Sequence, residues 1–504
     1  MNRRDFLKGL GIGAVALVAV NAGAIEQALS AAPAGAFQPA VTATRDDVAH
    51  VIARLSFGVT PDLYAHVRQI GAKAFIEEQL SPDNLTDADM TNRLQTYMPI
   101  LSQNGGVLAQ SENKMRKVIA GALIGSTTTR ALYSEKQLYE RMVQLFSDHF
   151  SLYIGKGNVV FLKVDDDRDT IRPNAMTTFR TILGASAHSP AMLVYLDNAK
   201  SEKSHPNENY ARELMELHTL SVNGGYTETD VKEVARAFTG WSIVGGKQSQ
   251  NGETVFKFRK MLHDTGSKVV LGTTIPNNGE ADGDKVLDIL AANPSTAKFV
   301  STKMLRKFVS DNPADALVQS CADAYLSSNG DIRTVLRTIF NSDDFWNAPP
   351  KFKQPFEYSV SVLRALDYDV QDDTAFVRSM TTPLTSMGNI PFDWPSPNGY
   401  PDVGAYWMNN LLPRWNFAIS AANNKIKGAQ AGFDSLNKLL QANNIAADSS
   451  AALAFFGQYL FGRPLTDAEH ETVLKFADAT PGDEQTQIHA GVALLLASPA
   501  YQYK

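Results

Sequence analysis

The stretch Thr227–Trp241, TETDVKEVARAFTGW, decides the fold class. Four of its apolar residues recur at the i, i+3, i+4, i+7 spacing that builds one face of an amphipathic helix: Val231, Val234, Ala235 and Phe238. Thr227 and Asp230 have the spacing of a capping box at a helix start, and Gly240 supplies a stop signal. The stretch therefore predicts a helix with one buried face.

The same helical spacing recurs along most of the chain, and alternating strand patterns are scarce. The best strand candidate is 253–272, which we interpret as a small β-hairpin insertion. A chain of 504 residues can bury a large core, which favours two or three helical subdomains. We therefore predict a mainly α, multi-helical fold with an N-terminal helical subdomain, a central motif-bearing region that includes the hairpin, and a C-terminal helical subdomain with an aromatic loop: 44–200, 201–350 and 351–504.

The N-terminus has the pattern of a twin-arginine export signal. Arg3 and Arg4 precede an apolar run, Gly9–Val20, which is followed by a small-residue cleavage pattern. The run is short for a membrane span, and an uncleaved membrane anchor is the alternative. We therefore assign residues 1–24 to a signal peptide and expect a bacterial or archaeal protein that works in the periplasm or outside the cell. Residues 25–43 are rich in Ala and Pro and predict a flexible mature N-terminus.

Composition narrows the classes of partner. The net charge is −6, and because the signal carries +2, the remaining chain carries −8 without a basic stripe, which argues against nucleic acid. No apolar run after the signal approaches the roughly 20 residues of a membrane helix, so we expect no membrane span in the mature chain. The single cysteine, Cys321, cannot form an intrachain disulfide and is expected to be a small core residue.

The segment His205–Asp230 places many ionisable groups in a region that otherwise reads as a buried helix. At 100° per residue, Asn209, Glu213 and Glu216 share one narrow stripe beside the apolar face. Carboxylates one turn apart repel each other unless they share a proton, share a cation or have separate partners. A shared proton predicts an acid and base pair of the kind that glycoside hydrolysis uses, with Arg212 and Asn209 as positioning groups.

Two alternatives stay open for this segment. Glu213, Glu216 and His218 could hold a divalent metal, and the sequence makes no cofactor certain. Zinc-finger, P-loop, dinucleotide, haem-attachment and Gly-x-Ser-x-Gly patterns do not occur. The other alternative is structural: Glu208 and Glu216 pair with Arg212 at i±4, and Glu213 meets water.

Other histidines and acids extend the set of candidates. His149 follows Asp148 at the end of an amphipathic helix, and His263 precedes Asp264 in the expected hairpin; both histidines are candidates to assist catalysis. Three aspartates in VDDDRDTIRPN have calcium-loop spacing, but the motif lacks its Gly and its final Glu. We interpret that run, 164–174, as a solvated acidic loop.

Aromatic residues gather in DWPSPNGYPDVGAYWMNNLLPRW, residues 393–415. Flat rings in a Pro- and Gly-rich loop suit stacking on sugars or on another protein, and they could equally fill a gap between subdomains. Arg414 is a candidate anion clamp. The predicted substrate-binding residues, from this loop and from the end of the helix in the opening stretch, are Trp394, Asn398, Tyr400, Trp407, Arg414 and Trp241.

Several long stretches together resemble one known bacterial family, the family catalogued as domain of unknown function 1800. They are HSPAMLVYLDNAKSEKSHPNENYARELMELHTLSVNGGYTETDVKEVARAFTGW (188–241), HDTGSKVVLG, KFVSDNP, PFEYSVSVLRAL and PSPNGYPDVGAYWMN. The resemblance covers nearly the whole mature chain. It implies twin-arginine export and an exported partner of the sulfatase-like or alkaline-phosphatase-like class, and it assigns no catalytic residues.

The sequence therefore supports three hypotheses. The first is an exported hydrolase or lyase that acts on an envelope or environmental polymer, a polysaccharide, with Glu213 and Glu216 as acid and base and with help from His149, His218 or His263. The second is a non-catalytic accessory or scaffold that works with the sulfatase-like partner. The third fills the same Glu and His cluster with a divalent metal.

Overall fold

The structure is a computed structural model that describes residues 22–41, 44–110, 115–245, 249, 251–409, 411–446 and 448–504. The twin-arginine pair and the apolar run of the expected signal peptide lie outside these residues. Helices predominate within them, and the strands pair in two-stranded sheets. The predicted mainly α fold is confirmed.

The N-terminal part is built of helices that start at capping residues. The side chains of Asp46 and Thr60 accept hydrogen bonds from backbone N–H groups at the starts of α3 and α4. The helices of this part are α2 (Ala22–Ala31), α3 (Asp47–Leu55), α4 (Pro61–Ile70), α5 (Ala72–Gln79), α6 (Ala88–Tyr97), α7 (Gly105–Leu108), α8 (Met115–Tyr133), α9 (Gln137–His149), α10 (Val159–Asp165), α11 (Phe179–His188) and α12 (Pro190–Tyr195).

The central part carries the motif helices and the hairpins. The capping box predicted from Thr227 and Asp230 is present at the start of α14, and Val231 and Val234 are buried on its inner face. The helices here are α13 (Glu208–Glu213), α14 (Glu228–Ala237), α15 (Ala281–Ala291), α16 (Pro294–Phe308), α17 (Asp315–Ser327), α18 (Ile332–Phe340) and α19 (Asp343–Trp346).

The β structure of the central part differs from the single hairpin predicted at 253–272. Two antiparallel hairpins are present: β1 (Trp241–Val244) with β2 (Val255–Phe258), and β3 (Lys268–Val270) with β4 (Thr273–Ile275). A short 3-10 turn, Lys260–Leu262, separates them. The predicted span therefore joins the second strand of one hairpin to the first strand of the next, because periodicity marks strands without marking their partners.

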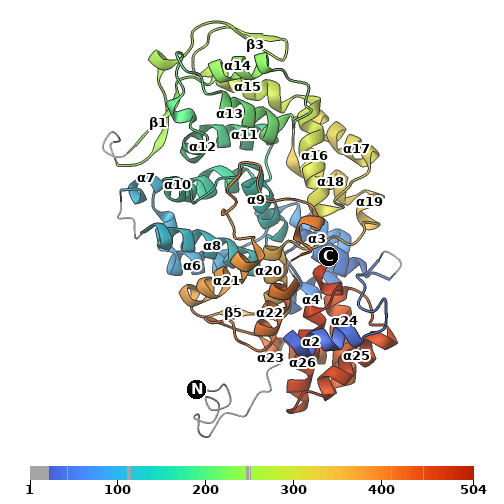
Figure 1. Cartoon of the computed structure of the whole chain (residues 1–504). Helices are drawn as coiled ribbons and strands as arrows, with labels where there is room; N and C mark the ends of the chain where they lie inside the picture. The colour runs from blue at the N-terminus through green and yellow to red at the C-terminus, as the bar shows by residue number, and fades with distance from the viewer. Residues whose placement is uncertain are drawn as a thin grey trace.

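The C-terminal part returns to helices. Its elements are α20 (Pro355–Ala365), β5 (Asp369–Val370), α21 (Asp373–Met387), α22 (Leu411–Ala422), β6 (Ala429–Gln430), α23 (Phe433–Ala442), α24 (Ser449–Phe461), α25 (Asp467–Asp478) and α26 (Glu484–Ala497). The long segment 391–409, which we call the aromatic loop, lies between α21 and α22 and contains one 3-10 turn, Gly404–Trp407. It crosses the centre of the molecule beside α9 (Figure 1), where the backbone N–H of Ile154 donates to the Phe392 carbonyl at 3.1 Å.

One large cluster of buried residues runs from Ile25 to Tyr501, so the chain ends share a core. The blue N-terminal helices α2 and α4 lie beside the red helices α24 to α26 (Figure 1). The expectation of a flexible 25–43 does not hold for its described residues: Ile25 is buried in α2, and the buried Phe37 donates its backbone N–H to Glu469 Oε1 at 2.5 Å. Burial of the apolar side chains of Ile25 and Phe37 stabilises this stretch in an ordered conformation, although its Ala- and Pro-rich composition is typical of a flexible segment.

Two smaller expectations concern Cys321 and the membrane. Cys321 is fully buried in α17 as a free thiol, so its predicted place in the core is confirmed. Among the residues that the structure describes, no helix has both the length and the apolar character of a membrane span.

Candidate functional site

The motif segment folds as a short α-helix that widens into a π-helix. Asn207 starts α13, since its side chain accepts a hydrogen bond from the Tyr210 N–H at 3.1 Å. Leu214–Thr219 then has π-helical geometry, a form that is rare and often found at functional sites. Tyr210 and Leu214 are buried, which leaves the polar stripe at the edge of the packed face.

Glu213 and Glu216 lie at this edge, partly buried, while Asn209 is exposed. Burial and the nearby charge of Glu216 raise the pKa of Glu213. Glu216 accepts a hydrogen bond from the Tyr226 hydroxyl at 3.3 Å. The two carboxylates therefore influence each other, as the spacing predicted.

Arg212 does not join these carboxylates. It makes two 2.7 Å hydrogen bonds to the carboxylate of Glu228, on the first turn of α14. The structural alternative, in which Arg212 pairs with Glu208 and Glu216 at i±4, is therefore wrong in its partners. Packing of α13 against α14 brings a carboxylate from a different helix within reach, and a two-pronged pair is the stronger one.

His149 and His218 meet beneath the motif helix. His149 Nε2 donates to the backbone carbonyl of His218 at 3.0 Å, and both rings are 2% exposed among Phe150 and Phe179. Burial, together with the positive charge of Lys303, lowers the pKa of His218 to about 3 and holds the pKa of His149 well below its usual value. Both rings are therefore neutral at pH 7 and serve as aromatic core groups.

The proposed metal ligands do not come together. His218 faces the aromatic core, whereas Glu213 and Glu216 lie at the surface edge of the helix. Across the described ranges, no group of three or more His, Cys, Asp or Glu side chains is placed to hold a metal ion. The geometry gives the metal hypothesis no support.

The aromatic loop forms a cluster of its own. Trp394 donates its indole N–H to Asn398 Oδ1 at 2.9 Å and lies 5.1 Å from the Tyr400 ring. Tyr400 and Trp407 are buried, and each donates to a backbone carbonyl, Tyr400 to Ile390 and Trp407 to Pro401. Of the predicted binding residues in the loop, only Trp394 and Asn398 keep accessible surface for a ligand.

The remaining predicted binding residues are core residues. Arg414 is fully buried, donates to the Lys353 carbonyl at 2.8 Å and stacks 4.5 Å above the Phe352 ring. Trp241 is also fully buried and donates to the Glu280 carbonyl. Neither side chain is on a surface that a substrate reaches. The prediction is wrong for both residues because the sequence pattern does not distinguish a side chain that packs in the core from one that lines a binding site.

His263 belongs to a separate buried network near the second hairpin. Its Nδ1 bonds to the Thr239 carbonyl at 2.7 Å, and its Nε2 lies 3.1 Å from Asp282. Lys268 completes the network with a 2.6 Å ion pair to the same carboxylate. With these partners His263 ties α14, the hairpin and α15 together, and the structure does not bring it to His149 or His218.

Tyr195 connects the motif helix with the aromatic loop. Its hydroxyl donates to the Pro395 carbonyl in the loop at 3.1 Å, and the Lys156 amine lies 5.1 Å from its ring. Burial and the charge of Glu213 raise the pKa of Tyr195 to about 12. Tyr195 therefore contacts the loop at Pro395 and is close enough to Glu213 to feel its charge.

Sequence reasoning missed Asp148, which lines a cavity of about 30 Å³ between α9 and the aromatic loop. Gln144, Asn389 and Tyr400 line the same cavity. Burial and the like charge of Asp402 raise the pKa of Asp148 to about 7, although Lys307 opposes the shift. The sequence pattern points to the adjacent His149 as the candidate. No local signal indicates that a distant loop covers Asp148.

The charge of Lys307 acts on Asp148, but among the described residues the two side chains form no ion pair. Its amine donates to Gln144 Oε1 at 2.8 Å. Burial, followed by the charge of Arg141, lowers the pKa of Lys307 to about 8. Within the described part of the chain, Asp148 has no ion pair or side-chain hydrogen bond. Asp148 and Lys307 therefore both titrate near neutral pH without forming an ion pair with each other.

The far wall of this cavity is an ion network where a solvated acidic loop was predicted. Asp167 and Glu140 both bind Arg172, at 2.8 and 2.9 Å, and Asp166 pairs with Lys163 at 2.7 Å. All five side chains are buried. The prediction is wrong because Asp166 and Asp167 sit on a π-helical turn and pair with Lys163 and Arg172, each about one turn away. Helix α9 adds a second acid, Glu140, to Arg172.

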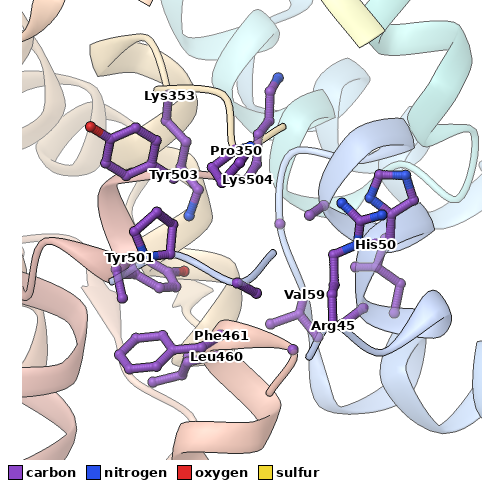
Figure 2. Close-up of a pocket in the computed structure, with 18 of the residues that line it drawn as sticks. Arg45, His50, Val59, Pro350, Lys353, Leu460, Phe461, Tyr501, Tyr503 and Lys504 are labelled. Atoms are coloured by element: carbon purple, nitrogen blue, oxygen red, sulfur yellow. The ribbon is translucent and has the colours of Figure 1, made fainter. Parts of the chain in front are cut away.

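A second cavity, of about 70 Å³, lies between α3 and the C-terminal segment (Figure 2). Arg45 and His50 line one side, and Lys353 and Tyr501 the other. The Lys353 amine lies 3.6 Å from the centre of the Tyr501 ring and bonds to Ser361 Oγ. Burial lowers the pKa of Lys353 to about 7. The cavity therefore buries a cation that has no ion pair in the part of the chain described.

Comparison with known proteins gives the family. Residues 50–503 match the model of the family described as protein of unknown function (DUF1800). No curated protein and no solved structure matches the chain. Because the match spans nearly all of the chain, from α3 to the last turn, the chain belongs to the DUF1800 family.

Proposed function

We propose that this chain is an exported hydrolase or lyase that acts on a polysaccharide of the cell envelope or the environment. Asp148 is the acid, and Lys307, which lines a separate small cavity under the same loop, is the base that reaches the site when the loop moves. At pH 7 a large fraction of Asp148 is protonated and can give its proton to a glycosidic oxygen. The neutral fraction of Lys307 takes a proton from the attacking water in a hydrolase, or from the sugar carbon in a lyase.

The observation that carries this proposal is an unpaired carboxylate on a cavity wall. The fully buried carboxylates among the described residues have cation partners, as Asp167 and Glu357 do. Asp148 lacks one among the described residues and instead faces the space under the aromatic loop. Groups with shifted pKa values in clefts mark candidate active sites.

The aromatic loop gives this site its substrate surface. Trp394 is partly exposed and is held in place by Asn398, so its ring offers a flat face to a sugar. The space at Asp148 holds about one water, so a polymer reaches it only when the loop moves. Glu213, whose charge acts on Tyr195, and Glu216 are the alternative acid and base.

The test is turnover on a panel of neutral and acidic polysaccharides by the mature protein, with and without a sulfatase-like exported partner. Asp148→Asn is expected to abolish product formation, whereas Glu213→Gln and Glu216→Gln reduce it only several-fold. If Asp148→Asn retains full activity while Glu213→Gln loses it, the acid is in the motif helix. Absence of turnover on every polymer contradicts the enzyme proposal.

One observation favours the accessory function as a second candidate. Four large apolar side chains are exposed where the aromatic loop meets α22: Tyr406, Met408, Leu411 and Leu412. Exposed apolar groups gathered in one place are typical of protein interfaces. Under this alternative Met408→Ser with Leu412→Ser weakens copurification with the sulfatase-like partner. Undiminished copurification of this double variant contradicts the alternative.

A further inference from the structure

A polar cleft of about 360 Å³ lies on the other side of the Arg172–Glu140 pair from Asp148. Arg172 and Glu140 line both this cleft and the smaller cavity under the aromatic loop. The remaining walls come from the end of α8, the start of α9, the segments 82–91 and 173–177, and Arg333 of α18. The candidate active site and this cleft are therefore separated by one ion pair.

Two cations of the cleft are unpaired among the described residues. Arg130 and Lys136 line it, and neither has an ion pair or a side-chain hydrogen bond among the residues that the structure describes. Arg130 is partly buried, and burial together with the neighbouring Arg172 lowers its pKa. A guanidinium in such a place has five N–H donors and no acceptor, which is unfavourable unless an anion arrives.

The acids of the cleft are already engaged. Glu140 binds Arg172, and Asp83 pairs with Arg333 at 3.0 Å. Asp87 accepts from the Ser134 hydroxyl at 2.6 Å and from the Glu135 N–H at 2.8 Å. Among the described residues none of these carboxylates forms an ion pair with Arg130 or Lys136, although the charges of Glu140 and Asp167 act on Arg130.

The unpaired cations of this cleft contrast with the net negative charge of the chain. The chain has a net charge of −6, which repels an acidic polymer in general. Unpaired cations in a polar cleft focus the local field and select for negative groups. A guanidinium binds carboxylate, sulfate and phosphate groups through paired hydrogen bonds.

From this geometry we infer that the cleft binds the negatively charged group of an acidic polysaccharide, with Arg130 and Lys136 as the ligand-binding residues. The inference rests on the proposed polysaccharide function and names its substrate class. The cleft and the Asp148 cavity share the Arg172–Glu140 wall, so an acidic unit held in the cleft lies on the other side of that pair from the proposed acid. Arg130 and Lys136 then set specificity, and Asp148 does the chemistry.

Binding is measured apart from turnover, by fluorescence anisotropy with labelled alginate, dextran sulfate and neutral dextran. We expect at least one acidic polymer to bind and neutral dextran not to bind. Arg130→Gln with Lys136→Gln should weaken that binding tenfold or more. Arg337→Gln is the control, because it removes one exposed positive charge, paired with Glu77, from a residue that does not line the cleft.

Binding by Asp148→Asn protein separates the inference from the proposed catalysis. If Asp148 is not catalytic but the inference is right, Asp148→Asn binds the acidic polymer as tightly as wild type, and the double variant does not. Equal binding of neutral dextran, or equal loss in Arg337→Gln, overturns the inference. Binding of inorganic sulfate or phosphate without either acidic polymer also overturns it, because the site then takes a free anion.

Discussion

Gly399 of the aromatic loop packs directly against the backbone carbonyl of Asp148, and no space remains for a Cβ atom. Gly399 also has a φ of +72°, in the left-handed region that favours glycine. This one contact seats the loop on the end of α9. It joins two segments that are about 250 positions apart in sequence, and it places Asp148 under the aromatic cover.

Gly399→Ala is expected to lift the loop from α9. Gly388→Ala is a matched control, since Gly388 has the same φ of +72° and open space at its Cβ position. Backbone strain alone should cost each variant about 1–2 kcal/mol. Gly399→Ala should lose more free energy of unfolding than Gly388→Ala, as measured by urea denaturation, and should be cut faster by protease within the loop. Equal losses would show that the contact with Asp148 is unimportant.

Asp148→Asn should stabilise the protein near neutral pH. The folded pKa of Asp148, about 7, is above the ordinary value of 3.8, so ionisation of this group costs stability as pH rises between these values. The variant should therefore match wild type near pH 4 and exceed it at pH 7.5. Urea midpoints at the two pH values measure this. The exposed Asp478→Asn is the control, and a gain that is the same at both pH values contradicts the prediction.

Glu357→Gln should destabilise the core strongly. Glu357 is buried and receives Arg141 and Lys504, each at 2.5 Å. Although burial alone would raise it, the pKa of Glu357 is held well below its usual range by these cations. Removing the carboxylate leaves both cations unpaired and should cost about 3–5 kcal/mol at pH 7.

The loss at Glu357 should depend on pH and on burial. A depressed carboxyl pKa stabilises above the unfolded value of 4.5 and loses its effect as pH falls below it. The difference between wild type and Glu357→Gln should therefore shrink in urea titrations at pH 3.5. Glu228→Gln breaks the exposed pair with Arg212 and should have no measurable effect, so a comparable loss there would refute the argument.

Lys353→Met should stabilise the protein. Lys353 is 7% exposed, and because its folded pKa of about 7 is below the ordinary 10.5, its charge is unfavourable in the core. Below pH 7 the full penalty applies, and it declines as pH rises toward 10.5, where the unfolded chain also loses the proton. The gain should be about 1–4 kcal/mol at pH 6 and smaller at pH 9.5 by urea denaturation.

Lys475→Met provides the comparison for Lys353, because Lys475 is an exposed lysine on α25. It should change stability little at either pH. A loss of stability in Lys353→Met would mean that the contact with the Tyr501 ring outweighs the burial of the charge.

The amino-acid sequence determined the helices, because their signals are local. The capping box at Thr227 and Asp230 and the apolar face of α14 are present as the spacing predicted. The aromatic cluster is also local, since Trp394, Tyr400 and Trp407 are within 14 positions and touch in the fold. The exposure of each ring was not predictable, because it depends on which distant segment covers it.

The ion-pair partners and the pKa values of the charged side chains were determined only by the tertiary structure. Arg212 finds Glu228 on the next helix instead of the i±4 acids that spacing offers, and Arg172 finds Glu140 on α9. Asp148 has no distinctive feature within its own helix. Its environment depends on two loop residues: Gly399, which packs on its backbone, and Asp402, whose charge raises its pKa. Helical periodicity reports which side of a helix is buried, whereas the pKa and the partner of a charged group depend on every segment packed around it. The candidate site therefore follows from how distant segments pack.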